Sequence, residues 1–402
     1  MKELREIHDW MKKTRRSFHA IPRVASLPDP TFVCEGRTMV SFSTNNYLGL
    51  AHTPRLINAA RKGLEQYGVG NCESRLLGGD MDIYRDLEAK LAHLKGKDAA
   101  LLFATGYLTN LGVLSALTTS GMVARVYGYR APLRHKHVYF SDELNHVSIR
   151  EGIRMSGAHK VTYRHCDMED LARKMKRTDA TCKIIASDAV FSMDGDIAPL
   201  PDMLRLAHEH DAMIYLDDAH GTGLLGETGA GTTEHFKLNS PRLICMGTLS
   251  KAYGAIGGFV AMDKHIAEIL RFTASSYGFT STIPPDQALA VAEAMAIVQD
   301  EPERRRRLWE NQRYFVARME GMGFRLISKQ SCIVPVFIGD EPLCQHYAKV
   351  LESNGFHVDA IAFPGVKIGQ ARLRFNMNAN HTREQIDRLL DVLGRQNKGG
   401  WK

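Results

Sequence analysis

The chain has 402 residues, of which 44% are hydrophobic and 24% are charged, and its formal net charge is +7 at pH 7. This length allows two domains with a sizeable buried core, and the composition is that of an ordinary globular protein. No uninterrupted apolar stretch reaches the ~18–20 residues of a membrane span. The basic residues are dispersed along the chain, and this pattern argues against a nucleic-acid partner.

Residues 1–50 are predicted to form an N-terminal helix and an arm. The first 22 residues have the pattern of a basic amphipathic helix that ends at Pro22, and they contain acidic residues but no apolar core. They therefore resemble neither a secretory signal nor a transit peptide. A strand-like segment, TMVSFS, follows at 38–43. The seven cysteines form no C-x-x-C pair, which predicts reduced thiols in a cytoplasmic protein.

Residues 51–287 are predicted to form a large domain of the α/β class. Apolar runs typical of strands alternate there with helical patterns, and this alternation predicts a mostly parallel sheet. The strand-like runs occupy residues 99–104, 137–142, 182–190, 213–219, 242–248 and 257–262. In such proteins ligands bind at the carboxyl edge of the sheet, so polar residues that follow these runs are the candidates for a site.

A basic stretch interrupts this pattern between Ser120 and His137. It holds three arginines and a lysine without any acid, together with two glycines and a proline. We predict an extended surface loop before the next strand. A tolerated insertion is one explanation, and binding of an acidic thioester carrier or of a membrane surface is the other.

Residues 288–402 are predicted to form a smaller α+β domain. Pro284 and Pro285 precede the helical stretch DQALAVAEAMAIVQ, because proline is tolerated at the start of a helix but not inside it. Strand-like runs follow at 332–339 and 371–377. The densest basic run, residues 304–307, is surrounded by glutamates, which predicts a solvated helix face rather than a nucleic-acid site.

Lys251 lies in the run CMGTLSKAYGAIGGFVA, just past a strand-like segment. An imine-forming lysine needs an unprotonated amine in a partly desolvated pocket, and the small neighbouring residues allow close approach. Thr248 and Ser250 offer hydroxyls that could bind a phosphate. Taken alone, a serine followed by a lysine is a weak signal, and an exposed lysine would be its ordinary explanation.

The second group stands 34 residues upstream, in IYLDDAHGTG. Asp217 ends an apolar strand, where a carboxylate could keep a pyridine nitrogen protonated. His220 could hydrogen-bond the phenolic oxygen of the same ring. The alternative for Asp217 and Asp218 is a helix N-cap pair, and we assign the capping or structural role to Asp218. Together with Lys251, this group indicates pyridoxal 5'-phosphate (PLP) chemistry and no metal.

Further candidates follow other predicted strands. Thr105, Gly106 and Tyr107 precede an apolar helix, and free N–H groups at the start of a helix can bind phosphate. His146 follows the strand at 137–142, so its ring could stack on a planar cofactor. Ser192 offers a hydroxyl in the turn after the strand at 182–190.

The joint pattern resembles the α-oxoamine synthases, which are PLP enzymes of aminotransferase-like fold (fold type I). The motifs that carry the resemblance run in order from about residue 40 to 395: NNYLGL, YGVG, SRLLGG, LEAKLA, SDELNH, FSMDGDIAPL, LDDAHGTGLLGETGAG, GTLSKAYGAIGG and ARLRFNMNANHT. This family is expected to act as a homodimer with a shared active site.

The resemblance implies a role for each matching residue. Lys251 would form the imine, Asp217 would pair with the pyridinium nitrogen, His220 and Ser192 would lie at the phenolate oxygen, and His146 would stack on the ring. The phosphate would be held by Gly106, Tyr107 and Thr248, and by Thr280 and Ser281 from the partner subunit. Asn45 and Ser74 would line the substrate end, and Arg374 would clamp the amino-acid carboxylate with its planar fork.

The implied reaction is a decarboxylative condensation of an amino acid with an acyl-CoA or acyl-carrier thioester. Lys251, displaced by the substrate amine, would remove the α-proton, and the carbanion would attack the thioester. Loss of carbon dioxide would give an α-amino ketone and a free thiol. The catalytic residues would be Lys251, His146 and Asp217.

The sequence leaves the substrates open. The motif GDIAPL and Ser74 resemble 8-amino-7-oxononanoate synthases, which we favour. NNYLGLA is shared with 2-amino-3-ketobutyrate CoA ligases, which use glycine, and a serine-using long-chain acyltransferase of the sphingoid type is also open. Tyr84, Gly365 and Lys367 depart from the family pattern, as does the long basic stretch. Other classes are an aminotransferase, a decarboxylase or a non-catalytic partner subunit, and the presence of Lys251 argues against the last.

Overall fold

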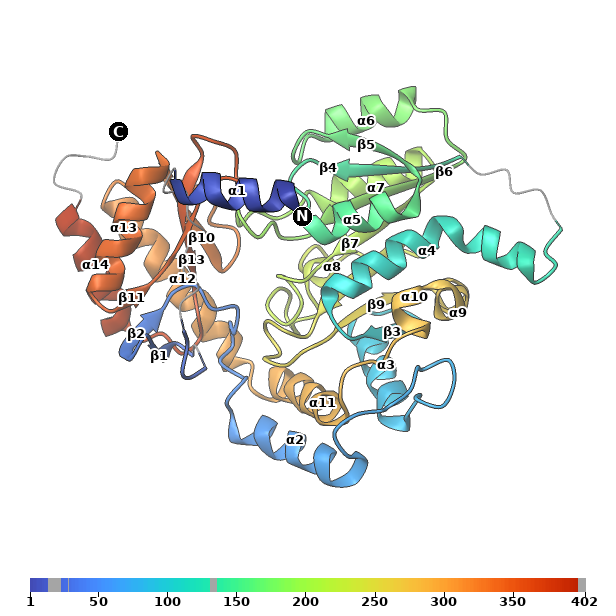
Figure 1. The fold of residues 1–402 in the computed structure, drawn as a ribbon, viewed down its shortest axis with the longest axis horizontal. Helices are drawn as coiled ribbons and strands as arrows, with labels where there is room; N and C mark the ends of the chain where they lie inside the picture. Colours follow the sequence, from blue (N-terminus) through green and yellow to red (C-terminus); the bar gives the residue numbers. More distant parts are fainter. Residues whose placement is uncertain (14–22, 28, 131–135, 397–402) are drawn as a thin grey trace.

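A computed structural model describes residues 1–13, 23–27, 29–130 and 136–396 (Figure 1). Its centre is a seven-stranded sheet with the strand order β3-β9-β8-β7-β6-β4-β5. Five neighbouring strands run parallel, and β9 is antiparallel to both of its neighbours. The strands are β3 (Ala99–Phe103), β4 (His137–Asp142), β5 (His159–Tyr163), β6 (Cys182–Asp188), β7 (Ala212–Asp217), β8 (Leu243–Thr248) and β9 (Gly258–Met262).

Helices cover both faces of this sheet because alternate strand residues are apolar on each side. Tyr215 of β7 packs in the apolar cluster formed with helices of one face, and its neighbours Ile214 and Leu216 pack in the cluster of the other face. The first face carries α4 (Gly106–Val126), α5 (Val147–Ser156), α9 (Lys264–Thr273) and α10 (Ser275–Gly278). The second face carries α6 (Met168–Arg177) and α7 (Leu200–Glu209).

The C-terminal part has its own antiparallel sheet, of order β10-β13-β12. Its strands are β10 (Ile333–Gly339), β12 (Asp359–Ile361) and β13 (Ala371–Asn376), and its helices are α12 (Glu303–Gly321), α13 (Glu341–Ser353) and α14 (Arg383–Gln396). The N-terminal arm joins this part of the molecule. β1 (Thr31–Cys34) pairs with β2 (Arg37–Ser41), and β2 runs parallel to β11 (Phe356–His357).

The remaining helices connect these parts. They are α1 (Lys2–Lys13), α2 (Pro54–Tyr67), α3 (Asp82–Leu94), α8 (Thr232–His235) and α11 (Pro285–Asp300). α1 buries none of its side chains, and the rest of the predicted N-terminal helix, up to Pro22, lies outside the described residues. Within the described ranges no helix is both long and apolar enough to cross a membrane.

The structure confirms the predicted fold class and all six predicted strands of the large sheet. It adds β5, whose sequence HKVTY is mostly exposed at the edge of the sheet and therefore lacks an apolar signal. The predicted strands at 332–339 and 371–377 and the helix after Pro284 are also present. The proposed domain boundaries at residues 50 and 287 stay predictions.

Two local predictions are wrong. The stretch after Ser120 is not a loop at its start, because α4 continues to Val126. Contact with α9 supports this part of the helix, since the Ser120 hydroxyl lies 3.0 Å from the Thr273 Oγ1. Gly121 does not end the helix, because a glycine inside a helix costs only ~1 kcal/mol. The arginine run of α12 is not fully solvated either. Arg305 is buried, and its guanidinium donates to the carbonyl oxygens of Val298 and Glu227.

Candidate active site

Lys251 lies just beyond the carboxyl end of β8, and its side chain is partly buried. Its Nζ donates to His220 Nε2 over 3.0 Å. Burial lowers the pKa of Lys251 from 10.5 to about 8, against the opposing charges of Asp217 and Asp188. The amine is therefore available as a nucleophile or proton acceptor close to neutral pH.

Asp217 ends β7 and is 3% exposed. Its Oδ2 accepts a 2.7 Å hydrogen bond from Asn110 Nδ2, and its Oδ1 accepts one from the backbone N–H of Ala219. Asp188 stands beside it in the register of β6 and β7. Burial and the neighbouring Asp217 raise the pKa of Asp188. The edge of the sheet thus presents a buried acid pair, in which Asp217 is the carboxylate suited to a ring nitrogen.

His220 is 7% exposed, and both of its ring nitrogens are engaged. The Tyr47 hydroxyl donates to Asn45 Oδ1, so its oxygen is left to accept from His220 Nδ1 at 2.8 Å. Burial, together with the charges of Lys251 and Arg374, lowers the pKa of His220 well below its ordinary value. The neutral ring therefore carries its proton on Nδ1 and presents the Nε2 lone pair to Lys251.

His146 caps the N-terminus of α5, and its side chain is only partly buried, so a planar ring can stack on it. Asn110 Nδ2 donates to Ser148 Oγ over 2.8 Å, which leaves the Ser148 hydroxyl to donate to His146 Nδ1 over 2.6 Å. Partial burial lowers the pKa of His146. The imidazole is thus neutral, with its proton on Nε2. Asn110 also serves Asp217, so one amide orients both catalytic candidates.

The first turn of α4 supplies an anion site next to these residues. The backbone N–H groups there have no partners within the helix, and Thr105 Oγ1 caps the turn by accepting from the N–H of Leu108. A Cβ at Gly106 would lie 2.9 Å from Met246 Cε and 3.2 Å from Thr248 Oγ1. Glycine therefore allows the helix start to approach Thr248, whose hydroxyl lies 2.9 Å from Ser250 Oγ. The donors present fit a phosphate.

Tyr107 and Thr248 are the other residues predicted to bind the phosphate. Tyr107 follows Gly106 at the helix start, but its phenol donates to Glu151 of α5. Tyr107 can therefore offer a phosphate its backbone N–H rather than its hydroxyl. Thr248 is buried, and its hydroxyl donates to the carbonyl oxygen of Gly257, so this hydroxyl has to turn before it can donate to a phosphate.

Arg374 enters the same region from the smaller sheet. It is 5% exposed, and its Nε donates to the backbone oxygen of Ser192 over 2.5 Å. Its charge is one of the causes that lower the pKa values of Lys251 and His220. Ser192 meets Arg374 through its carbonyl group, whereas the sequence had suggested its hydroxyl. Arg372, two residues earlier, is held by Asp194 and by the carbonyl oxygen of Met193.

Four other predicted residues remain, of which one belongs to this cluster and three do not contact Lys251. Asn45 belongs to it, since its Oδ1 also accepts from Asn376 Nδ2. Ser74 lies in the 71–79 turn, where its carbonyl oxygen accepts from the N–H groups of Leu77 and Gly79. Thr280 and Ser281 lie between α10 and α11. Within the described part of the chain, no hydrogen bond or ion pair joins Ser74, Thr280 or Ser281 to Lys251.

Sequence reasoning missed four residues of the site. Asn110 and Ser148 link His146 to Asp217, Tyr47 orients His220, and Asp188 lies beside Asp217. Tyr47 and Asp188 could have been found, because they stand in the motif NNYLGL and at the end of a predicted strand. Asn110 and Ser148 carry no such signal, since their role depends on the packing of α4 against α5.

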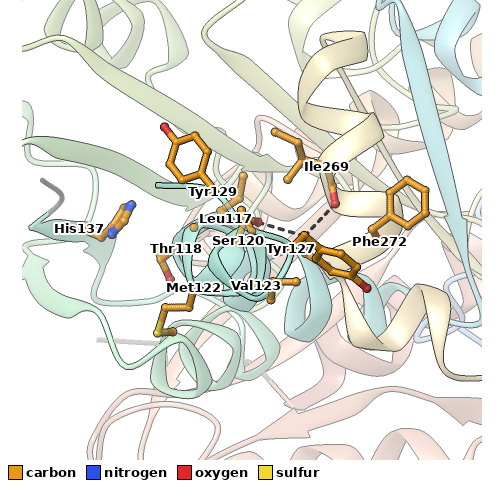
Figure 2. Close-up of a pocket in the computed structure, with 13 residues that line it drawn as sticks. Leu117, Thr118, Ser120, Met122, Val123, Tyr127, Tyr129, His137, Ile269 and Phe272 are labelled. Atoms are coloured by element: carbon orange, nitrogen blue, oxygen red, sulfur yellow. Dashed lines mark hydrogen bonds between the residues drawn. The ribbon is translucent and has the colours of Figure 1, made fainter. Parts of the chain in front are cut away.

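A large hollow of about 970 Å³ lies elsewhere, between the C-terminal half of α4 and the end of α9 (Figure 2). Apolar and aromatic side chains such as Leu117, Met122, Tyr127 and Phe272 line it. None of the residues of the Lys251 cluster is among its lining residues. We call it the α4–α9 groove, and it lies apart from the residues of the sheet edge.

Comparisons with known proteins agree with this geometry. The family model for aminotransferase class I and II matches residues 37–393. An 8-amino-7-oxononanoate synthase of Bacillus subtilis is 39% identical over 394 residues, covering 98% of this chain and 95% of the relative. One of Symbiobacterium thermophilum is 40% identical over 375 residues, covering 93% and 92%.

Solved structures give the same result. A serine palmitoyltransferase of Sphingomonas wittichii superposes with a TM-score of 0.89 at 28% identity, covering 99% of this chain and 96% of that one. A serine palmitoyltransferase that holds a PLP internal aldimine gives 0.90 at 29% identity, covering 99% and 98%. An 8-amino-7-oxononanoate synthase from Francisella tularensis gives 0.75 at 26% identity, covering 90% and 98%.

The lysine of lowered pKa, the buried carboxylate, the two imidazoles and the free N–H groups at the start of α4 fit PLP. The matches extend over nearly the whole of both chains at up to 40% identity. The chain therefore belongs to the aminotransferase class I and II family, and within it to the PLP-dependent α-oxoamine synthases.

Proposed function

We propose that this enzyme condenses L-alanine with a pimeloyl thioester, with loss of carbon dioxide, to give 8-amino-7-oxononanoate. The relatives that suggest this product are 37–40% identical to the chain over at least 371 residues. The product name itself defines the substrates. Its C8 and C9 correspond to alanine without its carboxylate, and its C1 to C7 correspond to a seven-carbon diacid.

The observation that carries the reaction class is the position of Lys251. Its amine lies 3.0 Å from a neutral imidazole and has a pKa lowered to about 8. A general base works best when its pKa is near the operating pH. PLP, when bound here, supplies an aldehyde that takes the substrate amine and a ring that withdraws electrons from its α-carbon.

We assign the following roles to the chain's own groups. The Lys251 amine takes the α-proton of the amino acid and later returns a proton to the product carbon. Asp217 keeps a proton at the cofactor's ring nitrogen, and the Asn110 amide keeps Asp217 in place. His146, neutral and held by Ser148, stacks on the cofactor and directs its Nε2–H into the site. We assign the Ser192 hydroxyl, with His220, to the phenolic oxygen of the cofactor.

Substrate binding is assigned to the smaller sheet and to the N-terminal arm. The Arg374 guanidinium binds the amino-acid carboxylate, with Asn45 beside it, because a planar fork matches a carboxylate. Arg374 suits this role better than Arg372, because its ion pair with Asp359 spans 3.7 Å, whereas Arg372 forms a close 2.6 Å ion pair with Asp194. Gly106, Tyr107 and Thr248 bind the cofactor phosphate.

We propose a homodimer in which Thr280 and Ser281 reach the phosphate of the partner and Ser74 reaches its substrate site. The segments that carry these residues also expose large apolar side chains. Leu77 is 77% exposed and Phe279 is 76% exposed. Apolar side chains exposed in this way are typical of a protein–protein interface. Light scattering of the purified protein measures the mass, and a monomer active at all concentrations would contradict this arrangement.

A matrix of amino acids against acyl thioesters tests the substrate assignment. Alanine, glycine and serine are each combined with acetyl, pimeloyl and palmitoyl thioesters of CoA and of a carrier protein. We expect thiol release and the mass of 8-amino-7-oxononanoate with alanine and the pimeloyl donor. A long-chain product from serine would favour the second candidate, which rests on the 0.89 TM-score to a serine palmitoyltransferase. Amino-group transfer without a thioester would indicate an aminotransferase.

A further inference from the structure

The turn at residues 191–197 lies between the large sheet and the small one and contacts the small sheet. It follows β6, and its backbone is closed by hydrogen bonds between Phe191 and Asp196 and between Gly195 and Phe191. A Cβ at Gly195 would lie 2.4 Å from the carbonyl oxygen of Ile333 in β10. The Ser331 hydroxyl donates to the Gly195 carbonyl over 2.7 Å. The turn is thus pressed directly against the small sheet.

Both arginines of β13 take their orientation from this turn. Arg374 Nε donates to the Ser192 carbonyl oxygen, and Arg372 Nη1 donates to the Met193 carbonyl oxygen and to Asp194. Apart from the Asp359 carboxylate, whose Oδ2 lies 3.7 Å from Arg374 Nη1, the direction of the Arg374 guanidinium depends on where the Ser192 carbonyl is held. A displacement of about 1 Å at a substrate-positioning group can cost 10²-fold in rate.

His165 supports the turn from the opposite side. It follows β5, and its Nε2 donates to Asp196 Oδ2 over 2.9 Å. Its Nδ1 donates to Asp142 Oδ1 over 3.0 Å, and its ring packs edge-to-face on Phe191 with 4.4 Å between the centroids. Both nitrogens can donate to carboxylates at the same time only when the ring is protonated. Burial alone would lower the pKa of His165, but the two carboxylates outweigh it and raise the pKa to about 12.

The same histidine also reaches the segment that carries His146. Asp142 ends β4, is 1% exposed, and accepts from the backbone N–H of Leu144 over 2.8 Å. Its other oxygen accepts from the N–H of Cys166. One cation therefore joins the loop before His146 to the turn that orients Arg374.

A metal ion is the rival explanation for this cluster. Ligand atoms of Asp142, His165 and Cys166 lie within 4.8 Å of one another. However, both His165 nitrogens are already bonded to carboxylates, and burial raises the pKa of the Cys166 thiol, which disfavours the thiolate that binds metals. The ion pairs account for the arrangement without a metal.

We propose that His165 is a positioning residue for the amino-acid site: as a cation between Asp142 and Asp196, it fixes the 191–197 turn, whose Ser192 carbonyl fixes Arg374. The inference rests on the proposed role of Arg374 as the carboxylate clamp. Two effects must follow from loss of the His165 charge. The 191–197 turn becomes more mobile, and Arg374 is then held less firmly for binding the amino acid.

Amide hydrogen exchange of the cofactor-free protein tests the first step without any catalysis. His165→Gln and Asp196→Asn keep the size of each side chain but remove the charge. We expect faster exchange over residues 189–197 in both variants and no change in Arg205→Gln, which breaks the exposed Arg205–Glu209 pair on α7. Unchanged exchange in the turn would overturn the proposal, and Asp196→Asn decides the question if His165→Gln does not fold.

Steady-state kinetics and a double-mutant cycle test the second step. We expect the amino-acid KM of His165→Gln to rise about tenfold or more, with the thioester KM within about twofold of the wild type. In the Arg374→Ala background the same substitution is expected to add almost nothing, because both act through one group. Additive effects, or a loosened turn with an unchanged amino-acid KM, would overturn the coupling. Absence of any thiol release in the wild-type protein would instead contradict the proposed function.

Discussion

The carboxyl edge of the large sheet and the α4–α9 groove are two very different regions, although α4 contributes to both. At the edge, α4 begins with a turn suited to a phosphate. The titratable groups there are bonded to one another, as Lys251, His220 and Tyr47 show. In the groove, α4 ends among apolar side chains that are open to solvent, such as Met122 at 61% and Tyr127 at 87% (Figure 2).

The difference shows which physical feature marks chemistry in this protein. Burial of a titratable group costs free energy unless partners compensate for it, so clusters of shifted pKa values point to function. The size of a hollow carries no such information. Substitutions at the edge are therefore expected to change the reaction, and substitutions in the groove are not.

The largest effect is expected for Lys251→Ala. The variant loses both the covalent attachment point of the cofactor and the proton acceptor, so thiol release should fall at least about 10³-fold. Stopped assays of free thiol measure it, with the exposed Lys264→Ala as the matched control. Activity within tenfold of the wild type would remove Lys251 from the mechanism.

Substitutions of the neighbouring Asp217 and Asp218 are expected to have different effects: Asp217→Asn should impair the reaction, and Asp218→Asn should lower the stability of the fold. Asp217→Asn should retain the cofactor but lose about 10²-fold in α-proton exchange, because the amide no longer holds a proton at the ring nitrogen. Asp218 instead accepts from Lys95 Nζ over 2.7 Å in a buried pair. Leaving Lys95 unpaired costs about 3–5 kcal/mol, so Asp218→Asn should unfold at a lower temperature. Equal exchange in wild type and Asp217→Asn would argue against this assignment.

Arg374→Ala is expected to raise the amino-acid KM by about 10–100-fold with the cofactor still bound. The control is Arg205→Gln, which breaks the exposed Arg205–Glu209 pair on α7 and should leave the amino-acid KM unchanged. Initial rates at varied alanine concentration give both values. Loss of the cofactor from Arg374→Ala would show that the clamp is assigned wrongly.

A smaller effect concerns pH. Burial lowers the pKa of Lys251 from 10.5 to about 8 in the cofactor-free protein, so its amine becomes neutral at lower pH than an exposed lysine. The rate of recombination with PLP should rise as pH approaches about 8 and level off above it, since the neutral amine is the nucleophile. Absorbance of the bound cofactor follows the rate. A rate that still climbs through pH 10 would mean that the pKa is not lowered.

The smallest effect is expected in the groove. Phe272 is 65% exposed and lines the groove but not the Lys251 cluster. Phe272→Ser should leave kcat/KM within about twofold, as surface substitutions away from functional contacts usually do. A large loss of activity with normal cofactor content would show that the two regions are coupled.

The sequence predicts the positions of two candidate residues at the ends of apolar strands, and the structure places them there. Asp217 and Lys251 follow β7 and β8, where topology places ligand sites. Asn110 could not be predicted, because an amide inside the apolar sequence of α4 acquires its role only when α4 packs against α5 and β7. β5 could not be predicted, because an edge strand needs few apolar residues. The burial of Arg305 could not be predicted either, because the charge of a local run does not reveal which of its side chains are buried.

The central claim is that the amine of Lys251 bears the cofactor. Borohydride reduction of the purified enzyme, followed by digestion and mass spectrometry, tests it most directly. The account predicts a single pyridoxyl-modified peptide that contains Lys251. A modified peptide centred on a different lysine, or no modified peptide from protein that carries one PLP per chain, would contradict it.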